Sequence, residues 1–77
     1  MNNINNNKIE QKVINDFCEK ITKKKIHTKD NLFKILDSLE IMTLISSLEH
    51  RFKIKFNMIK LLNKKKLDLL DIKNLLQ

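Results

Sequence analysis

The sequence predicts an all-α fold, a small bundle of three main helices and one short third helix with a long first loop. The 77 residues include no Gly and no Pro, so tight turns that need a positive φ are scarce and hairpins are disfavoured. Apolar residues recur at helical spacing and, without Trp or Tyr, must form a core of mainly Leu and Ile. We expect a disordered N-terminus over residues 1–7 and a single domain over residues 8–77.

The first half of the chain is expected to hold one helix and a long connection. The helix is predicted from Lys8 to about Lys23. Its apolar stripe is formed by Ile9, Val13, Ile14, Phe17 and Ile21. Cys18 lies on the flank of this stripe and is interpreted as a small packing residue. Residues 24–37 then form a loop with apolar anchors, and a long loop of this kind is often functional.

The second half is expected to hold the other three helices. The second helix runs from Ser38 to about Phe52, with Ile41, Leu44, Ile45, Leu48 and Phe52 on one face. Residues 53–56 form an extended connector that turns Ile54 and Phe56 inward. Asn57 caps a short helix over residues 58–62, and a last helix begins near Asp68.

Ser38 stands at the junction between the long connection and the second helix. Asp37-x-x-Glu40 is an aspartate variant of the capping box, so the N-cap role is filled without Ser38. The hydroxyl would then be free at the positive end of the helix dipole, which favours an anion by about 0.3–1 kcal/mol. Leu39 faces away from the apolar stripe and Met42 lies at its border. These two apolar side chains beside Ser38 suggest a binding surface for a partner or for an attached apolar group.

Composition limits the cellular setting and the choice of ligand. The formal charge of +7 permits contact with nucleic acid or anionic membrane surfaces. Fifteen of the sixteen cations are Lys, however, whereas base readout favours Arg, and the excess of Asn, Ile and Lys equally fits an AT-rich genome. One cysteine cannot form an internal disulfide, and no apolar run approaches the ~20 residues that span a bilayer. With no apolar signal segment at the N-terminus, we expect a cytoplasmic protein.

Several stretches together resemble the acyl and peptidyl carrier protein family over roughly residues 8–76. Asp37-Ser38-Leu39 matches the family's attachment motif, and it is followed by the apolar residues Met42, Leu44, Ile45 and Leu48. Residues 48–54 parallel the Leu-Glu-x-x-Phe-x-Ile close of the family's second helix. Leu32-Phe33 is similar to the loop of the aminoacyl and peptidyl branch.

The resemblance implies a four-helix carrier-protein bundle in which Ser38, flanked by Asp37 and Leu39, binds a phosphopantetheine arm. A phosphopantetheinyl transferase would esterify the arm from coenzyme A. Acyl or aminoacyl groups would be held on it as thioesters and presented to loading and acyl-transfer enzymes of fatty-acid, polyketide or aminoacyl/peptidyl biosynthesis. Neither His27 nor His50 is placed by sequence as a base for Ser38, so the chain would be a monomeric substrate of enzymes and not an enzyme.

The resemblance also implies two surfaces. Docking of partners is expected on the outer face of the second helix, at Leu39, Met42, Thr43, Ser46 and His50. The attached chain is expected to shelter between the second and third helices, near Met42, Ile45, Ile59 and Leu62. Two features depart from the family pattern. Residues 34–36 hold no Gly before the Asp-Ser pair, and the docking face lacks the usual carboxylates, so docking to basic patches of fatty-acid synthase enzymes should be weakened.

Three alternatives stay open. A basic helical nucleic-acid-binding module would use the lysine runs 23–25 and 64–66, but nucleic acid is disfavoured by the lack of Arg and stacking aromatics. A plain protein-interaction bundle would use Ser38 only as a cap. A metal site built from Cys18, His27 and His50 lacks any ligand pair of useful spacing, so no metal is predicted.

Overall fold

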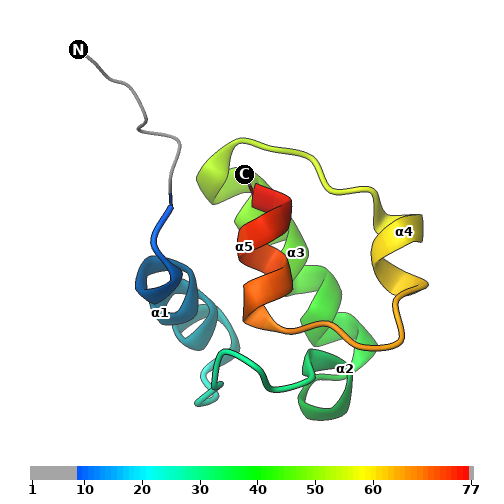
Figure 1. The fold of residues 1–77 in the computed structure, drawn as a ribbon, viewed down its shortest axis with the longest axis horizontal. Coiled ribbons are helices and arrows are strands. Elements are labelled where there is room, and N and C mark those ends of the chain that lie inside the picture. The colour runs from blue at the N-terminus through cyan, green and yellow to red at the C-terminus, as the bar shows by residue number, and fades with distance from the viewer. Residues whose placement is uncertain (1–8, 77) are drawn as a thin grey trace.

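A computed structural model describes residues 9–76 and confirms the all-α fold (Figure 1). Its helices are α1 (Gln11–Thr22), α2 (Leu32–Ile35), α3 (Ser38–Phe52), α4 (Met58–Leu62) and α5 (Leu69–Leu76). α1 packs against α3 and α5, and α4 lies on the other side of these two helices (Figure 1). α2 packs on α3. The predicted disordered N-terminus, residues 1–7, lies outside the described residues.

The core is aliphatic and receives side chains from all five helices. Its buried members are Ile14, Cys18, Ile26, Leu32, Leu36, Ile41, Leu44, Ile45, Leu48, Phe56, Leu61, Leu67, Leu69, Ile72 and Leu76. The predicted stripe of α3 is confirmed, with its last member, Phe52, half-buried and edge-on to Phe17 at 6.0 Å between ring centroids. Val13 is 43% exposed, so its place in the α1 stripe was wrong. The stripe follows the line from Ile14 to Cys18, and Val13 lies about 100° around the helix from Ile14.

Two boundaries in the first half differ from the prediction. α1 begins at Gln11 and not at Lys8, because Glu10 is extended. The long connection is not loop throughout, because α2 forms one helical turn within it. The Asn31 side chain caps this turn by accepting a hydrogen bond from the Phe33 N–H at 3.1 Å. A four-residue helix is too short to show helical periodicity, so the sequence pattern did not reveal it.

Hydrogen bonds fasten the long connection to the segment that leads into α5. The Leu32 N–H donates to the Leu67 carbonyl at 2.7 Å, and the Leu67 N–H donates to Asn31 Oδ1 at 3.2 Å. The Leu69 N–H donates to the Thr28 carbonyl at 3.0 Å. These contacts hold α2, and therefore the start of α3, in a fixed place relative to the rest of the bundle.

The second half agrees closely with the prediction. α3 and α4 have the expected bounds, and Asn57 Oδ1 caps α4 by accepting from the Lys60 N–H at 3.1 Å. The extended connector buries Phe56, whose N–H donates to Glu49 Oε2 at 2.8 Å. Asp68 precedes α5, and its Oδ1 accepts from the Asp71 N–H at 2.8 Å.

The predicted capping box is present at the start of α3. Asp37 Oδ1 accepts from the Glu40 N–H at 2.8 Å, and Glu40 Oε1 accepts from the Asp37 N–H at 2.9 Å. The backbone therefore enters the helix at a defined angle directly before Ser38.

We expect Asp37→Ala to lower the free energy of unfolding by about 1 kcal/mol, because the Glu40 N–H loses its acceptor. Asp37→Asn keeps an oxygen acceptor at the same place and should stay within a few tenths of a kcal/mol of the parent. Urea unfolding followed by circular dichroism measures both. Equal losses for the two variants would show that the charge, and not the cap, is what matters.

Candidate functional site

Ser38 is the first residue of α3, and its side chain is exposed. Asp37 serves as the N-cap, so the Ser38 hydroxyl is not required for capping. Across residues 9–76, no hydrogen bond engages this hydroxyl or the backbone N–H groups of Ser38 and Leu39. The sequence contains two further serines, Ser46 and Ser47, and both lie inside α3. Ser38 alone combines a free hydroxyl with the positive end of a helix dipole.

The backbone reaches Ser38 without the help of glycine. Leu36 is extended, with φ −114° and ψ 144°, a conformation open to any residue. In the described part of the chain, positive φ occurs at Lys23 and Lys53, which end α1 and α3. The absence of Gly from residues 34–36, which departs from the family pattern, therefore imposes no backbone strain beside Ser38.

Lys24 braces this junction from the long connection. Its Nζ donates to the Ile35 carbonyl at 3.1 Å and lies 3.1 Å from Glu40 Oε2. One ammonium group thus joins the end of α2 to the first turn of α3. The pair is partly exposed, so its effect is on the orientation of the junction more than on stability.

A hollow of about 480 Å³ opens beside Ser38. It is lined by Phe33, Leu36, Asp37, Ser38, Ile41, Met42, Leu62 and Lys64. Met42 and Leu62, 53% and 52% exposed, come from α3 and α4, and both line this hollow. Ile45 and Ile59 do not join them, because Ile45 is in the core and Ile59 is 75% exposed and not in the lining.

The five residues predicted for docking all lie on the exposed side of α3. Leu39 is 74% exposed, and the side chains of Met42, Thr43, Ser46 and His50 are also exposed. They form a mixed apolar and polar face that begins next to Ser38 and continues toward the far end of the helix. No carboxylate side chain belongs to this set.

Lys24 and Lys64 were given no role at the site from the sequence. Lys64 lines the hollow, and Lys24 braces the junction. Both belong to the lysine runs 23–25 and 64–66, which the sequence suggested as contacts of the alternative nucleic-acid-binding module. The roles seen here depend on how separate helices meet, which a single run of sequence does not show.

The remaining reactive side chains do not form a second centre. Cys18 is fully buried, and burial raises the pKa of its thiol from 9.0 to about 12, which confirms its interpretation as a packing residue. His27 and His50 are exposed. Within residues 9–76, no group of three metal-ligating side chains gathers, and no helix there is long and apolar enough to cross a bilayer.

Comparison with known proteins gives one match. The family model described as "Phosphopantetheine attachment site" matches residues 11–70. The matched range runs from the first residue of α1 into α5, and it includes Ser38 and the whole lining of the hollow. Searches of the curated proteins and of the solved structures returned no match.

Proposed function

We propose, since this chain belongs to the phosphopantetheine attachment site family, that the Ser38 hydroxyl is the point at which the arm is attached. Members of the family hold phosphopantetheine covalently and act as carriers that interact with partner enzymes. The observation that carries the proposal is a free, exposed hydroxyl on the first residue of a capped helix.

The surroundings of Ser38 fit a phosphodiester. The exposed oxygen leaves room for esterification, and the unengaged N–H groups of Ser38 and Leu39 favour an anion. Lys64 is the one cation in the lining of the hollow, and it would partly neutralise the negative charge of the phosphate. When bound, phosphopantetheine supplies a flexible arm whose terminal thiol forms thioesters.

The chain's own part in loading is to present Ser38, not to activate it. Asp37 is the carboxylate next to Ser38; its Oδ1 accepts the Glu40 N–H, and among residues 9–76 no hydrogen bond joins Asp37 to the Ser38 hydroxyl. A general base must lie within hydrogen-bond reach of the proton that it removes. We therefore assign removal of the Ser38 proton to a phosphopantetheinyl transferase and regard the chain as a carrier without catalysis of its own.

The cargo proposed is an acyl or aminoacyl group held as a thioester on the arm. Asp37 and Leu39 flank the attachment point, and the exposed face of α3 receives loading and acyl-transfer enzymes. Met42 and Leu62 would cover the apolar part of a cargo that folds back into the hollow beside Ser38. Fatty-acid, polyketide and aminoacyl/peptidyl pathways all use thioesters of this kind.

Intact mass measurement tests the proposal. The purified chain is incubated with coenzyme A, Mg²⁺ and a broad-specificity phosphopantetheinyl transferase, and its mass is compared with that of a sample lacking the transferase. We expect a gain of one phosphopantetheine per chain. An unchanged mass, under conditions in which the transferase modifies another carrier, would contradict the proposal.

A further inference from the structure

Most of the net positive charge of the chain comes from the stretch of sequence that contains Ser38. Residues 34–66, which run from the end of α2 to the segment after α4 and are called here the α2–α4 segment, hold eight Lys or Arg and three Asp or Glu. The cations are Lys34, Arg51, Lys53, Lys55, Lys60, Lys64, Lys65 and Lys66, all exposed. This segment therefore carries a net charge of +5 out of the +7 of the whole chain.

The three carboxylates of the α2–α4 segment are already used inside the fold. Asp37 and Glu40 form the capping box, and Glu40 also pairs with Lys24. Glu49 accepts the Phe56 N–H at 2.8 Å. These hydrogen bonds fix the positions of the three carboxylates but do not cancel their charges, so the segment keeps its net charge of +5 because the cations outnumber them.

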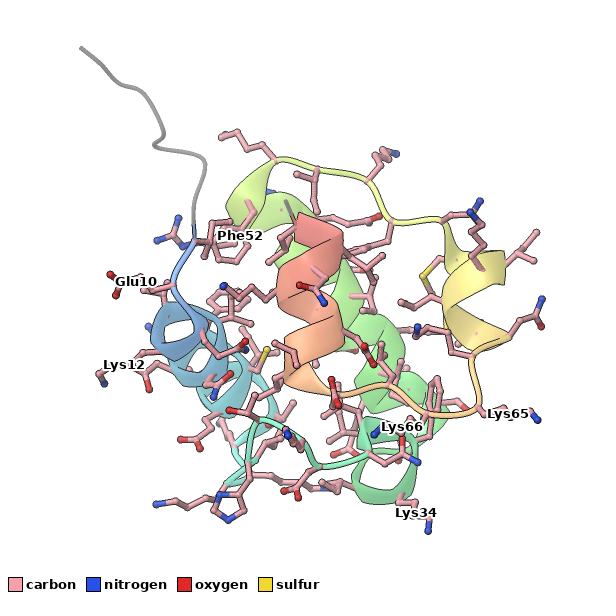
Figure 2. All side chains as sticks on the ribbon, in the orientation of Figure 1. Glu10, Lys12, Lys34, Phe52, Lys65 and Lys66 are labelled. Atoms are coloured by element: carbon pink, nitrogen blue, oxygen red, sulfur yellow. The ribbon has the colours of Figure 1, made fainter. Side chains whose placement is uncertain are left out.

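The cations, in contrast, are almost all free. Lys66 lies 3.7 Å from Asp68 Oδ2, and among residues 9–76 none of the other seven has a carboxylate within ion-pair distance. Figure 2 shows Lys34, Lys65 and Lys66 at the α2 end of the molecule, with the side chains of Lys34 and Lys65 directed outward. Unpaired surface cations attract carboxylates on an approaching protein and raise the association rate.

Exposed apolar side chains lie among these cations. Leu39 and Met42 on α3 and Ile59 and Leu62 on α4 are each more than half exposed. Met42 and Leu62 both line the hollow beside Ser38. Protein–protein interfaces usually have an apolar centre surrounded by a polar rim.

We propose that the α2–α4 segment is a docking surface for proteins whose contact surface is acidic around an apolar centre. The inference rests on the proposed function, since it identifies the kind of enzyme that modifies or loads Ser38. Such an enzyme places carboxylates opposite Lys34 and Lys60 and an apolar side chain against Leu39 and Met42. A basic contact surface is repelled by the same cations.

A nucleic acid fits the same observations less well. Seven of the eight cations are Lys, which bind phosphate as point charges, and Arg51 stacks over the Phe52 ring with its Cζ 5.4 Å from the ring centroid. A nucleic acid would place charged phosphates against the exposed apolar side chains, and this contact would add nothing to the binding free energy. An acidic protein surface with an apolar centre uses both features at once.

The test compares two phosphopantetheinyl transferases, one with an acidic and one with a basic surface around its active-site entrance. Each modifies the parent chain and two charge variants over a range of salt, and kcat/KM is measured by intact mass. The docking variant is Lys34→Glu with Lys60→Glu, taken from helices on the two sides of the hollow. The matched control is Lys12→Glu with Lys29→Glu, exposed residues outside the α2–α4 segment that change the net charge equally. Figure 2 shows Lys12 on α1, across the molecule from α4.

We expect the acidic transferase to modify the parent faster and to slow about tenfold between low and high salt. The docking variant should lose about tenfold in kcat/KM with the acidic enzyme and gain with the basic one, while the control stays within about twofold of the parent. Equal losses for both variants, or a preference for the basic enzyme, would overturn the inference and leave Ser38 as the attachment site. Binding of a short DNA duplex at about 150 mM salt that only the docking variant loses would assign the segment to nucleic acid instead. Absence of modification by either enzyme would contradict the proposed function itself.

Discussion

Ser38→Ala is expected to take up no phosphopantetheine under conditions that convert the parent chain completely. The substitution removes the oxygen to which we assign the phosphodiester and changes little else. The cap of α3 belongs to Asp37 and Glu40, and the Ser38 side chain is exposed. Alanine is also a better helix former than serine. Intact mass after incubation with coenzyme A and transferase gives the result directly.

The other two serines of the chain provide matched controls. Ser46→Ala and Ser47→Ala lie on the same helix and remove the same hydroxyl group. Both should be modified completely, because neither residue is at the helix start. Since Ser46 is on the proposed docking face, we expect its variant to be modified more slowly but to reach the same final mass. Full modification of Ser38→Ala would show that the attachment residue is elsewhere.

Leu44→Ala is expected to lower the free energy of unfolding by about 2–5 kcal/mol. Leu44 lies on the core side of α3 and is fully buried, and the bundle closes on it from several helices. Deletion of its side chain leaves a cavity that an aliphatic core fills only in part. Small domains have few kcal/mol in reserve, so the loss would remove a large share of the stability. Urea unfolding followed by circular dichroism measures it.

Leu39→Ala is the matched control for this variant, since it makes the same chemical change on the same helix. Leu39 is 74% exposed, so its removal should change stability by less than about 0.5 kcal/mol. The same variant should slow modification of Ser38, because Leu39 belongs to the proposed docking face. Equal destabilisation by the two variants would mean that α3 is not oriented as described here.

The parts of the fold that the sequence predicted correctly are determined by residues that lie close together in the chain. α3 and α4 begin where Asp37 and Asn57 can cap, and the stripe of α3 repeats for about three turns. α2 was missed although Asn31 caps it, because one turn is too short to show helical periodicity. The start of α1 was missed because Glu10 makes no side-chain cap before it. Local chemistry predicts a helix boundary only where a side chain satisfies the helix end.

The candidate site likewise has one part that the local sequence predicts and one part that depends on the packing of separate helices. The exposed position of Ser38 follows from a capping box that is visible in the sequence. The hollow does not, because it forms where α4 returns to α3 and brings Leu62 and Lys64 beside Ser38. Ile45 was predicted both for the apolar stripe of α3 and for the shelter; the structure buries it in the core, and it does not line the hollow. The lining of the hollow depends on how helices pack, which a single stretch of sequence does not encode.

Localisation of the arm within the modified chain tests the central claim most directly. Cleavage after Lys34 and Arg51 releases residues 35–51, a peptide that contains all three serines of the chain. Fragmentation of this peptide by tandem mass spectrometry should place the whole mass of phosphopantetheine on Ser38, with unmodified fragments that contain Ser46 and Ser47. Phosphopantetheine found on any other side chain, or none on a chain fully exposed to an active transferase, would contradict the account.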